Sequence, residues 1–571
     1  MPPFLSSLSS RVTPSEAAAP NAFARFAPAA AFHLAALAVM IWSEFGAFRL
    51  AVFIFAWGLT NFCWLLLLRR PGLSAALSFA MLVALVAVSR FKFAELSMTA
   101  SFIDVMIIDS DTVAFLGTVF PKIRATALIV LVLGLPLAVL LWKLDPLRVR
   151  RGTAVSGIGG CICGVAALSA INPIIQGEGF GDRNYVSHFA RSGVEAVADY
   201  WAQGFLESDA TASGRLDLAI EDSCHAAGVR PHIILVHDES SFDLRAIEGI
   251  KVPPGYGGHF RSLDGKARKF LVEGAGGPSW YTEYNVLSGL SSRSYGRFQF
   301  FVTRIAAGRV RRGLPQALRR CGYGTHAIYP VSGGFLGSRS FYKGVGVQNF
   351  VEGSDIGGGA FEPDRFYFHA GARLIERERD RGPLFLYLYL TANHFTWDYT
   401  FHPELTPAGW RAPGNLMPEV DEYLRRQAMS ERDYAEFLAR LKRDFPAEPF
   451  LIVRFGDHQP DFAAVMVDST VDFAELTRRL VRYDPRYFTT YYAIDAVNFA
   501  PVRLASALDP LDAPYLPLAV QEAAGLPLDL SFAEQRKILN RCNGLFYGCA
   551  GGSEARRFNR LLIDAGLIKG L

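Results

Sequence analysis

The chain has 571 residues, of which 51% are hydrophobic, and its formal net charge is +4. This length is more than one domain usually holds, and so apolar a composition is unusual for a soluble protein. A charge excess this small for the size of the chain gives no support to nucleic acid as a partner, so we exclude that class.

Long apolar runs dominate the chain up to about Ile175, and beyond this point charge, Pro and Gly return to globular levels. Because about 20 residues of helix cross the apolar core of a bilayer, these runs predict membrane-spanning helices. A cleaved signal peptide is disfavoured, since the N-terminal stretch is polar and the runs follow it directly. We therefore assign residues 1–176 to a transmembrane domain. Its five predicted spans are Ala29–Trp42, Leu50–Leu68, Leu73–Val88, Ala125–Trp142 and Ala154–Ile175.

Basic residues orient this predicted bundle. They cluster between the second and third spans and between the fourth and fifth, and the positive-inside rule places such clusters in the cytoplasm. With five spans, the chain from Gln176 onward then lies on the extracytoplasmic (periplasmic) side of the inner, or plasma, membrane. The clusters are Arg69 with Arg70, and Lys143 with Arg148, Arg150 and Arg151.

One further apolar stretch, Phe102–Phe120, carries Asp104, Asp109 and Asp111. Three carboxylates are costly in hydrocarbon, so this stretch is not counted as a span. We expect instead a helix that lies at the outer membrane interface.

The outer half of the chain alternates between apolar runs and helical patterns. We predict a connector at 177–228 that contains the helix Gly193–Leu206, a catalytic α/β domain at 229–545, and a C-terminal tail at 546–571. Three apolar runs turn polar abruptly, which is typical of buried strands at the carboxyl edge of an α/β sheet, where ligands bind. The runs are HIILVHDESSFD, LFLYLYLTANHF and FLIVRFGDHQPD, and the helices predicted between them include Leu314–Cys321 and Glu419–Arg443.

Four of the seven cysteines fall in the outer half, where disulfides persist. Cys542 and Cys549 bracket a short loop that contains Gly (CNGLFYGC), so we predict that these two pair. The sequence contains no CxxC pattern of the kind that binds metal.

The three strand ends carry Asp238, Glu239, His394, Asp457 and His458. Carboxylates and imidazoles form a mixed oxygen and nitrogen ligand set, which suits manganese, magnesium or zinc. A single polar residue after a strand is usually a cap or a turn, but three such clusters at one edge of one sheet favour a metal site. The residues alone therefore predict a metal site that performs hydrolysis or group transfer.

Several of these segments also resemble a known family. FGDHQPD is similar to the Gly-Asp-His segment of the sulfatase-like branch of the alkaline phosphatase superfamily. VHDESS and GPSWYTEYNVLSGL resemble the first metal-ligand strand and the nucleophile segment of its lipoteichoic acid synthases, phosphoglycerol transferases and phosphoethanolamine transferases. The similarity keeps its order from about His232 to Pro460. It implies a transmembrane bundle followed by an α/β alkaline-phosphatase-like domain with a central mixed, mostly parallel sheet.

The resemblance also implies roles for individual residues. Ser279 falls at the position of the family's nucleophile, and Arg339, in GGFLGSRSFY, at the position that contacts the substrate phosphate. His394, in TANHFTW, corresponds to the His that approaches the leaving group. The implied cofactor is a divalent cation, with Mn²⁺ favoured over Mg²⁺ or Zn²⁺. Its implied ligands are Glu239, Ser279, Asp457 and His458.

Departures from the family leave alternatives open. The family's nucleophile is mostly Thr, whereas this chain has Ser279, with Thr282 as a nearby competitor. The C/S-x-P-x-R context that marks true sulfatases is missing at Ser279, which argues against sulfate ester hydrolysis. Gly337 and Ser338 replace the Trp-Asn that helps to contact glycerol phosphate in lipoteichoic acid synthases.

As a whole, the resemblance implies transfer of a phosphoglycerol-type group from a membrane phospholipid to an envelope glycan or glycolipid, through a phosphoserine intermediate. A phosphoethanolamine transferase is the nearest alternative, followed by a phosphodiester or sulfate ester hydrolase of the same fold. A non-catalytic membrane scaffold is a further alternative, which a complete set of implied ligands disfavours.

Overall fold

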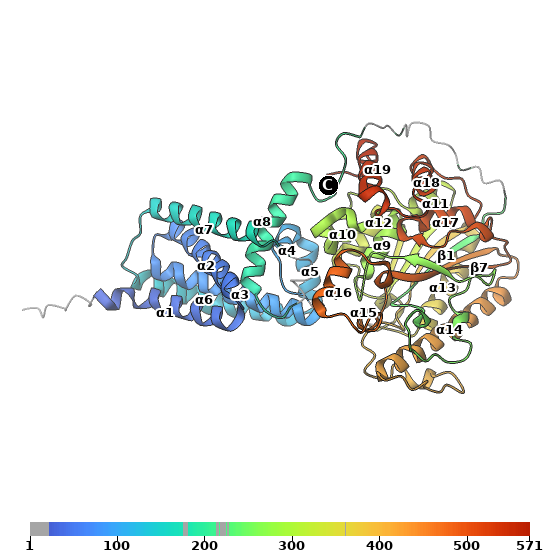
Figure 1. Cartoon of the computed structure of the whole chain (residues 1–571), viewed down its shortest axis with the longest axis horizontal. Helices are drawn as coiled ribbons and strands as arrows, with labels where there is room; N and C mark the ends of the chain where they lie inside the picture. Colours follow the sequence, from blue (N-terminus) through green and yellow to red (C-terminus); the bar gives the residue numbers. More distant parts are fainter. Residues whose placement is uncertain are drawn as a thin grey trace, which may run out of the picture. The chain divides into compact units, whose positions relative to one another are not determined.

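The structure is a computed structural model of the full chain (Figure 1). Its described residues are 22–96, 98–174, 181–212, 216, 224, 228–359 and 361–570. The chain forms two compact units, one of Met1–Asp104 with Lys122–Glu195 and the other of Val105–Pro121 with Ala196–Leu571. The end of the fifth predicted span, at Ile175, and much of the predicted connector between 213 and 227 lie outside the described residues.

The first unit contains five helices that are long and apolar enough to cross a membrane. Each one contains all or most of a predicted span and begins a few residues before it. Two of them start with proline, Pro71 and Pro121, because the first turn of a helix needs no backbone N–H partner and therefore tolerates this residue. The helices are α1 (Ala22–Ser43), α2 (Ala47–Leu68), α3 (Pro71–Leu96), α6 (Pro121–Leu144) and α7 (Arg151–Ile171), and α8 (Tyr185–Gln203) follows them.

The stretch Phe102–Phe120 forms two short helices rather than one, α4 (Phe102–Ile107) and α5 (Ser110–Val119). Asp109 separates them, because its side chain accepts a hydrogen bond from the backbone N–H of Thr112 at 2.9 Å and caps α5. A cap residue leaves the helical backbone conformation, so it ends the helix before it. The interfacial position of this stretch stays a prediction.

The second unit is built on an eight-stranded sheet with the order β4-β3-β5-β1-β6-β7-β2-β8. Neighbouring strands are parallel from β4 to β6 and at β2–β8, and antiparallel at β6–β7 and β7–β2. The prediction of a mixed, mostly parallel sheet is thus confirmed, and the three predicted strands are its central members. The strands are β1 (His232–Asp238), β2 (Arg268–Leu271), β3 (Gly324–Tyr329), β4 (Asn349–Glu352), β5 (Leu384–Tyr389), β6 (Phe450–Gly456), β7 (Thr489–Val497) and β8 (Leu511–Asp512).

Helices occupy the connections between these strands and the C-terminal part of the chain. The two helices predicted between the apolar runs are present as α11 and α14. The C-terminal helix α19 packs through buried Phe558 and Leu562. The helices are α9 (Ser279–Ser288), α10 (Val302–Ala306), α11 (Leu314–Arg320), α12 (Ser338–Gly344), α13 (Asp364–Glu378), α14 (Pro418–Asp444), α15 (Asp461–Met466), α16 (Phe473–Val481), α17 (Leu516–Ala523), α18 (Leu530–Cys542) and α19 (Ser553–Asp564).

Both faces of the sheet are covered by helices (Figure 1). On one face, α13 and α14 pack against Ile234 and Val236 of β1 in the main apolar core. On the other face, Tyr342 of α12 contacts Tyr387 of β5, with ring centroids 5.5 Å apart. Successive side chains of a strand point to opposite faces, so His237 of β1 lies on the face of α12.

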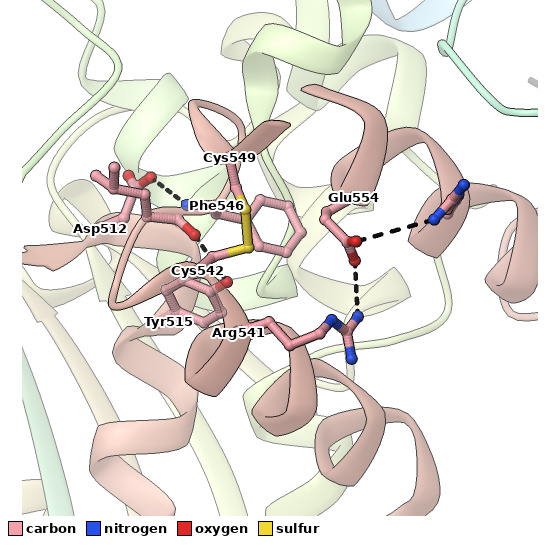
Figure 2. Close-up of a disulfide and its surroundings, with 9 residues drawn as sticks. Asp512, Tyr515, Arg541, Cys542, Phe546, Cys549 and Glu554 are labelled. Carbon is pink, nitrogen blue, oxygen red and sulfur yellow. Dashed lines mark hydrogen bonds and ion pairs between the residues drawn. A yellow bond between two sulfur atoms is a disulfide. The ribbon is translucent and has the colours of Figure 1, made fainter. Parts of the chain in front are cut away.

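Cys542 and Cys549 form a disulfide, as predicted, at the end of α18 (Figure 2). The loop that this bond closes contains Phe546, whose backbone N–H donates to Asp512 Oδ2 at 2.9 Å. The disulfide therefore holds the end of α18 beside β8 of the sheet. A second disulfide joins Cys224 and Cys321.

Candidate active site and metal centre

The candidate site forms where β1 and β6 end side by side. The two strands are parallel neighbours, with Asp238 opposite Gly456, so the residues that follow leave the same edge of the sheet. A side chain at position 456 would not fit, because a Cβ there would lie 1.9 Å from the carbonyl oxygen of Ser241. This close approach of two backbones brings Glu239 and Asp457 together.

Four of the implied site residues meet at this edge. Ser279, the first residue of α9, donates its hydroxyl to Glu239 Oε2 at 3.1 Å. Its Oγ also lies 3.3 Å from His458 Nε2. That Nε2 atom lies 3.3 Å from Glu239 Oε1 and 3.4 Å from Asp457 Oδ2. All four side chains are buried, and Ser279 is the most exposed of them at 6%.

His237 is a fifth member of this cluster that the sequence reasoning missed. Its Nε2 lies 2.9 Å from Asp457 Oδ2, and its Nδ1 lies 2.8 Å from the hydroxyl of Tyr387. Ligand atoms of His237, Glu239 and Asp457 all lie within 4.8 Å of one another. A signal was present in the sequence, because His237 is two residues before Glu239 and the alternation of a strand puts both on one face.

The cluster fits a divalent cation. Asp457 Oδ2 is buried and makes no hydrogen bond of good geometry within the described residues, and neither does His237 Nε2, although the two atoms are close. Buried polar atoms without partners are rare in folded proteins, and an unpaired carboxylate oxygen is a preferred ligand of Mn²⁺ and Mg²⁺. Carboxylate, hydroxyl and imidazole donors that converge on one point are what such an ion needs.

Charge is concentrated in this buried cluster. Burial by itself would raise the pKa of Glu239, but the hydrogen bond and the charge of His458 outweigh it and lower that pKa. Burial opposes the charged form of His458, yet Asp457 and Glu239 raise its pKa to about 9. Both effects show that the site stabilises a positive charge beside its carboxylates.

A third carboxylate, Glu283, lies one turn along α9 from Ser279. It is buried and accepts a hydrogen bond from the hydroxyl of Tyr342 at 2.7 Å. Burial raises the pKa of Glu283 to about 7. Helical spacing of four residues places it on the same side of α9 as Ser279. The sequence reasoning did not assign a role to this residue.

Two other implied site residues lie apart from these contacts. The ring of His394 stacks between those of Phe361 and Phe395, at centroid distances of 4.0 and 4.6 Å. His394 is close enough for its charge to contribute to the lowered pKa of Glu239. Arg339, at the start of α12, donates instead to Glu352 Oε1 at 2.6 Å. The structure thus brings together the four implied metal ligands but pairs Arg339 elsewhere.

The competing nucleophile, Thr282, is engaged with the backbone. Its hydroxyl is fully buried and donates to the carbonyl oxygen of Asp457 at 2.7 Å. Ser279 instead faces the side chains of Glu239 and His458. The two residues are three apart on α9, so their side chains point about 60° apart, and this offset directs Thr282 at the backbone of Asp457 and Ser279 at Glu239.

Residues 277–474 match the family model of sulfatases. This part of the chain is similar to sulfatases, and the second unit, which contains it, is named the sulfatase domain after this similarity. The resemblance to the sulfatase-like branch is thereby confirmed. The matched sulfatase region runs from the residues just before α9 into α16, so it includes Ser279, Asp457 and His458, and Glu239 precedes it.

Among solved structures, the chain is similar at low identity to a lipoteichoic acid synthase, a phosphoglycerol transferase and a phosphoethanolamine transferase. The lipoteichoic acid synthase LtaP from Listeria monocytogenes is 15% identical, with 55% of this chain and 76% of that chain covered and a TM-score of 0.40. The phosphoglycerol transferase GacH from Streptococcus pyogenes, in complex with sn-glycerol-1-phosphate, is 14% identical, with 59% and 87% covered and a TM-score of 0.45.

The third is the lipooligosaccharide phosphoethanolamine transferase A from Neisseria meningitidis, which is 12% identical. It covers 88% of this chain and 94% of its own, with a TM-score of 0.39. No curated protein matches the chain significantly.

Proposed function

We propose that this protein is a membrane-anchored, metal-dependent phosphotransferase in which Ser279 is the nucleophile. The observation that carries the proposal is the position of Ser279 Oγ, 3.1 Å from Glu239 Oε2 and 3.3 Å from His458 Nε2 at a buried edge of the sheet. A hydroxyl held between a carboxylate and an imidazole is an arrangement that activates nucleophiles.

Glu239, Ser279, Asp457 and His458 would hold the divalent cation, and Mn²⁺ fits this set best because oxygen ligands outnumber nitrogen. When bound, such an ion lowers the pKa of a hydroxyl and neutralises phosphoryl oxygens. His237 and Tyr389 contact two of these ligands. His237 Nε2 lies 2.9 Å from Asp457 Oδ2, and Tyr389 donates its hydroxyl to Glu239 Oε2 at 2.6 Å. Such supporting hydrogen bonds orient ligands and tune the ion.

In the proposed reaction the hydroxyl proton of Ser279 leaves along the hydrogen bond to Glu239, and Oγ attacks the phosphorus of the donor. The bond from phosphorus to the oxygen of the lipid alcohol breaks, and His394 protonates that oxygen. His394 Nδ1 lies 2.7 Å from the carbonyl oxygen of Phe395, which can only accept, so Nε2 faces away as the group that meets substrate. An acceptor hydroxyl then attacks the phosphorus of the phosphoserine and gives its proton to His394. The bond from phosphorus to Ser279 Oγ breaks, and Glu239 returns its proton to Oγ.

Arg339 has the proposed role of binding the phosphate. Its guanidinium is 42% exposed and already pairs with one carboxylate, Glu352. A phosphate offers the same two-oxygen face as that carboxylate, so Arg339 can exchange one for the other.

For the donor we propose a membrane phospholipid with a phosphoglycerol-type head group, and for the acceptor an envelope glycan or glycolipid. The five apolar helices support a lipid donor, since they hold the enzyme in the bilayer that contains it. The basic clusters that flank the spans support an extracytoplasmic position of the sulfatase domain, at the inner membrane.

The test is to incubate the full chain in detergent with Mn²⁺ and either phosphatidylglycerol or phosphatidylethanolamine, and to analyse the peptide that contains Ser279 by mass spectrometry. A glycerophosphoryl adduct on Ser279 is the expected result. A phosphoethanolamine adduct would reassign the donor, and an adduct on Thr282 would overturn the nucleophile. Ser279→Thr, which keeps a hydroxyl, should retain the adduct, whereas Ser279→Ala should abolish it.

A further inference from the structure

The second unit contains a cavity of about 840 Å³ that the proposed reaction does not use. Its walls come from three places: the residues around the start of α5, the end of α10 with the loop after it, and α12. None of the proposed metal ligands lines it, nor do the two other proposed catalytic residues.

Positive charge dominates the lining of this cavity. Four cationic side chains line it against a single carboxylate, that of Asp109, which leaves three positive charges in excess. Asp109 forms an ion pair with Arg304. Within the described part of the chain, no carboxylate pairs with the other three cations. These are Arg309, Arg311 and Lys343.

Arg309 supplies a second observation that indicates a ligand. Its Nη1 atom is buried and makes no hydrogen bond to any of the described residues. Its guanidinium carbon lies 5.7 Å from the centre of the Phe205 ring, which also lines the cavity. A buried donor without a partner is unfavourable. An anionic oxygen in the cavity would remove that cost.

Part of the rest of the lining is apolar, and this part precedes a candidate membrane span in the chain. Met106, Ile107 and Ile108 form one wall, and Ile305 adds to it. The chain of this wall continues through α5, which ends at Val119, into the apolar helix α6, which begins at Pro121. A small anion would meet the cations but leave this wall uncovered, whereas an anionic amphiphile would cover both.

We propose that this cavity binds the head group of an anionic phospholipid, with the phosphate on Arg309 and Lys343 and the glycerol and first methylene groups on the wall of Met106–Ile108. Basic pockets beside membrane helices recognise lipid head groups in this way. The bound lipid is not the reacting one, so the inference does not rest on the proposed reaction. Its role is to hold the sulfatase domain at an anionic membrane surface.

The test is a binding titration of the full chain in neutral detergent, with phosphatidylglycerol, phosphatidylcholine or inorganic phosphate as the probe and native mass spectrometry as the readout. The double variant R309Q/K343Q removes two cations from the cavity. Its matched control, R373Q/K442Q, removes the same two charges from exposed positions on α13 and α14 that do not line the cavity.

We expect R309Q/K343Q to weaken phosphatidylglycerol binding about 30-fold, since each cation near a phosphate contributes about fivefold. The control should bind as the unmodified protein does. The charge-preserving variant R309K/K343R should stay within about threefold of it, which separates loss of charge from loss of fold.

Equal binding by R309Q/K343Q and its control would overturn the proposal, as would equal affinity for phosphatidylcholine. If inorganic phosphate binds as tightly as phosphatidylglycerol, the proposal of a lipid ligand is wrong and the cavity is a site for free phosphate. Because the readout is binding and not turnover, a failure here leaves the Ser279 adduct test unaffected, and a failure of that test leaves this one unaffected.

Discussion

Two buried polar clusters lie on opposite faces of the part of the sheet that contains β1, β6 and β7. The reaction cluster contains His237, Glu239, Ser279, Asp457 and His458. The paired cluster lies across the sheet and consists of Asp238, His259, Arg454, Asp495 and Tyr491. They differ in one physical property, which is whether every buried polar atom has a protein partner.

In the paired cluster every charge is matched. Asp238 Oδ2 lies 2.8 Å from His259 Nε2 and accepts the hydroxyl of Tyr491 at 2.5 Å. Arg454 Nη2 lies 3.2 Å from Asp495 Oδ2. No buried polar atom of these side chains lacks a hydrogen bond, whereas the reaction cluster leaves two such atoms unpaired. A cluster that is fully paired stabilises the fold, and one that is left incomplete is ready to bind a ligand.

The largest effect should come from Ser279→Ala. We expect transfer of the phosphoryl group to fall by about 10⁴-fold or more, because the substitution removes the hydroxyl that lies between Glu239 and His458. The measurement is the rate of head-group transfer from labelled phosphatidylglycerol, with the melting midpoint of the full chain as a check that the fold is intact. Transfer that persists at more than a few per cent of the original rate would contradict the assignment.

The next effect belongs to the paired cluster. Asp495→Asn leaves Arg454 buried without its ion-pair partner, so we expect a loss of about 3–5 kcal/mol of unfolding free energy. Denaturant unfolding of the full chain in detergent measures it. The bound metal per folded molecule should not change, and a parallel fall in metal content would show that the two faces are coupled.

A smaller effect on the metal itself should follow from His237→Gln. His237 contacts Asp457 from the strand, so its loss should weaken Mn²⁺ binding about 10–100-fold, as with other residues that orient metal ligands. Isothermal titration with Mn²⁺ after chelation provides the measurement. Asp238→Asn, the neighbouring residue on the opposite face, is the matched control and should leave Mn²⁺ affinity as it is.

The smallest effect concerns Asp512, a buried carboxylate that belongs to neither cluster. Burial, together with the charge of Glu273, raises its pKa to about 7 in the folded protein. The folded state therefore holds a proton that the unfolded state releases near pH 4, so stability falls as the pH rises from about 4 to 7. Asp512→Asn removes the titrating group but keeps an oxygen that accepts the N–H of Phe546, so stability should change less between about pH 4 and 7. Melting midpoints across that pH range measure the change. An unchanged slope would refute the assignment.

Much of the architecture follows from local sequence pattern. Five apolar helices and three central strands were predictable because burial in lipid or in a sheet core requires long runs of one chemical type. Glu239 and Asp457 could be named as candidates because polar residues directly after such strands have to leave at the sheet edge. The division of Phe102–Phe120 into two helices at Asp109 was not predicted, because it depends on one side chain that caps α5.

The five apolar helices, the three central strands and the types of side chain that follow those strands can be predicted from the sequence, because they depend on residues that are neighbours in the chain. Packing in three dimensions places Ser279 rather than Thr282 against Glu239, pairs Arg339 with Glu352, and brings cations from α10, the loop after it and α12 around one cavity. These relations join residues far apart in sequence, and they depend on packing directions that no local pattern encodes.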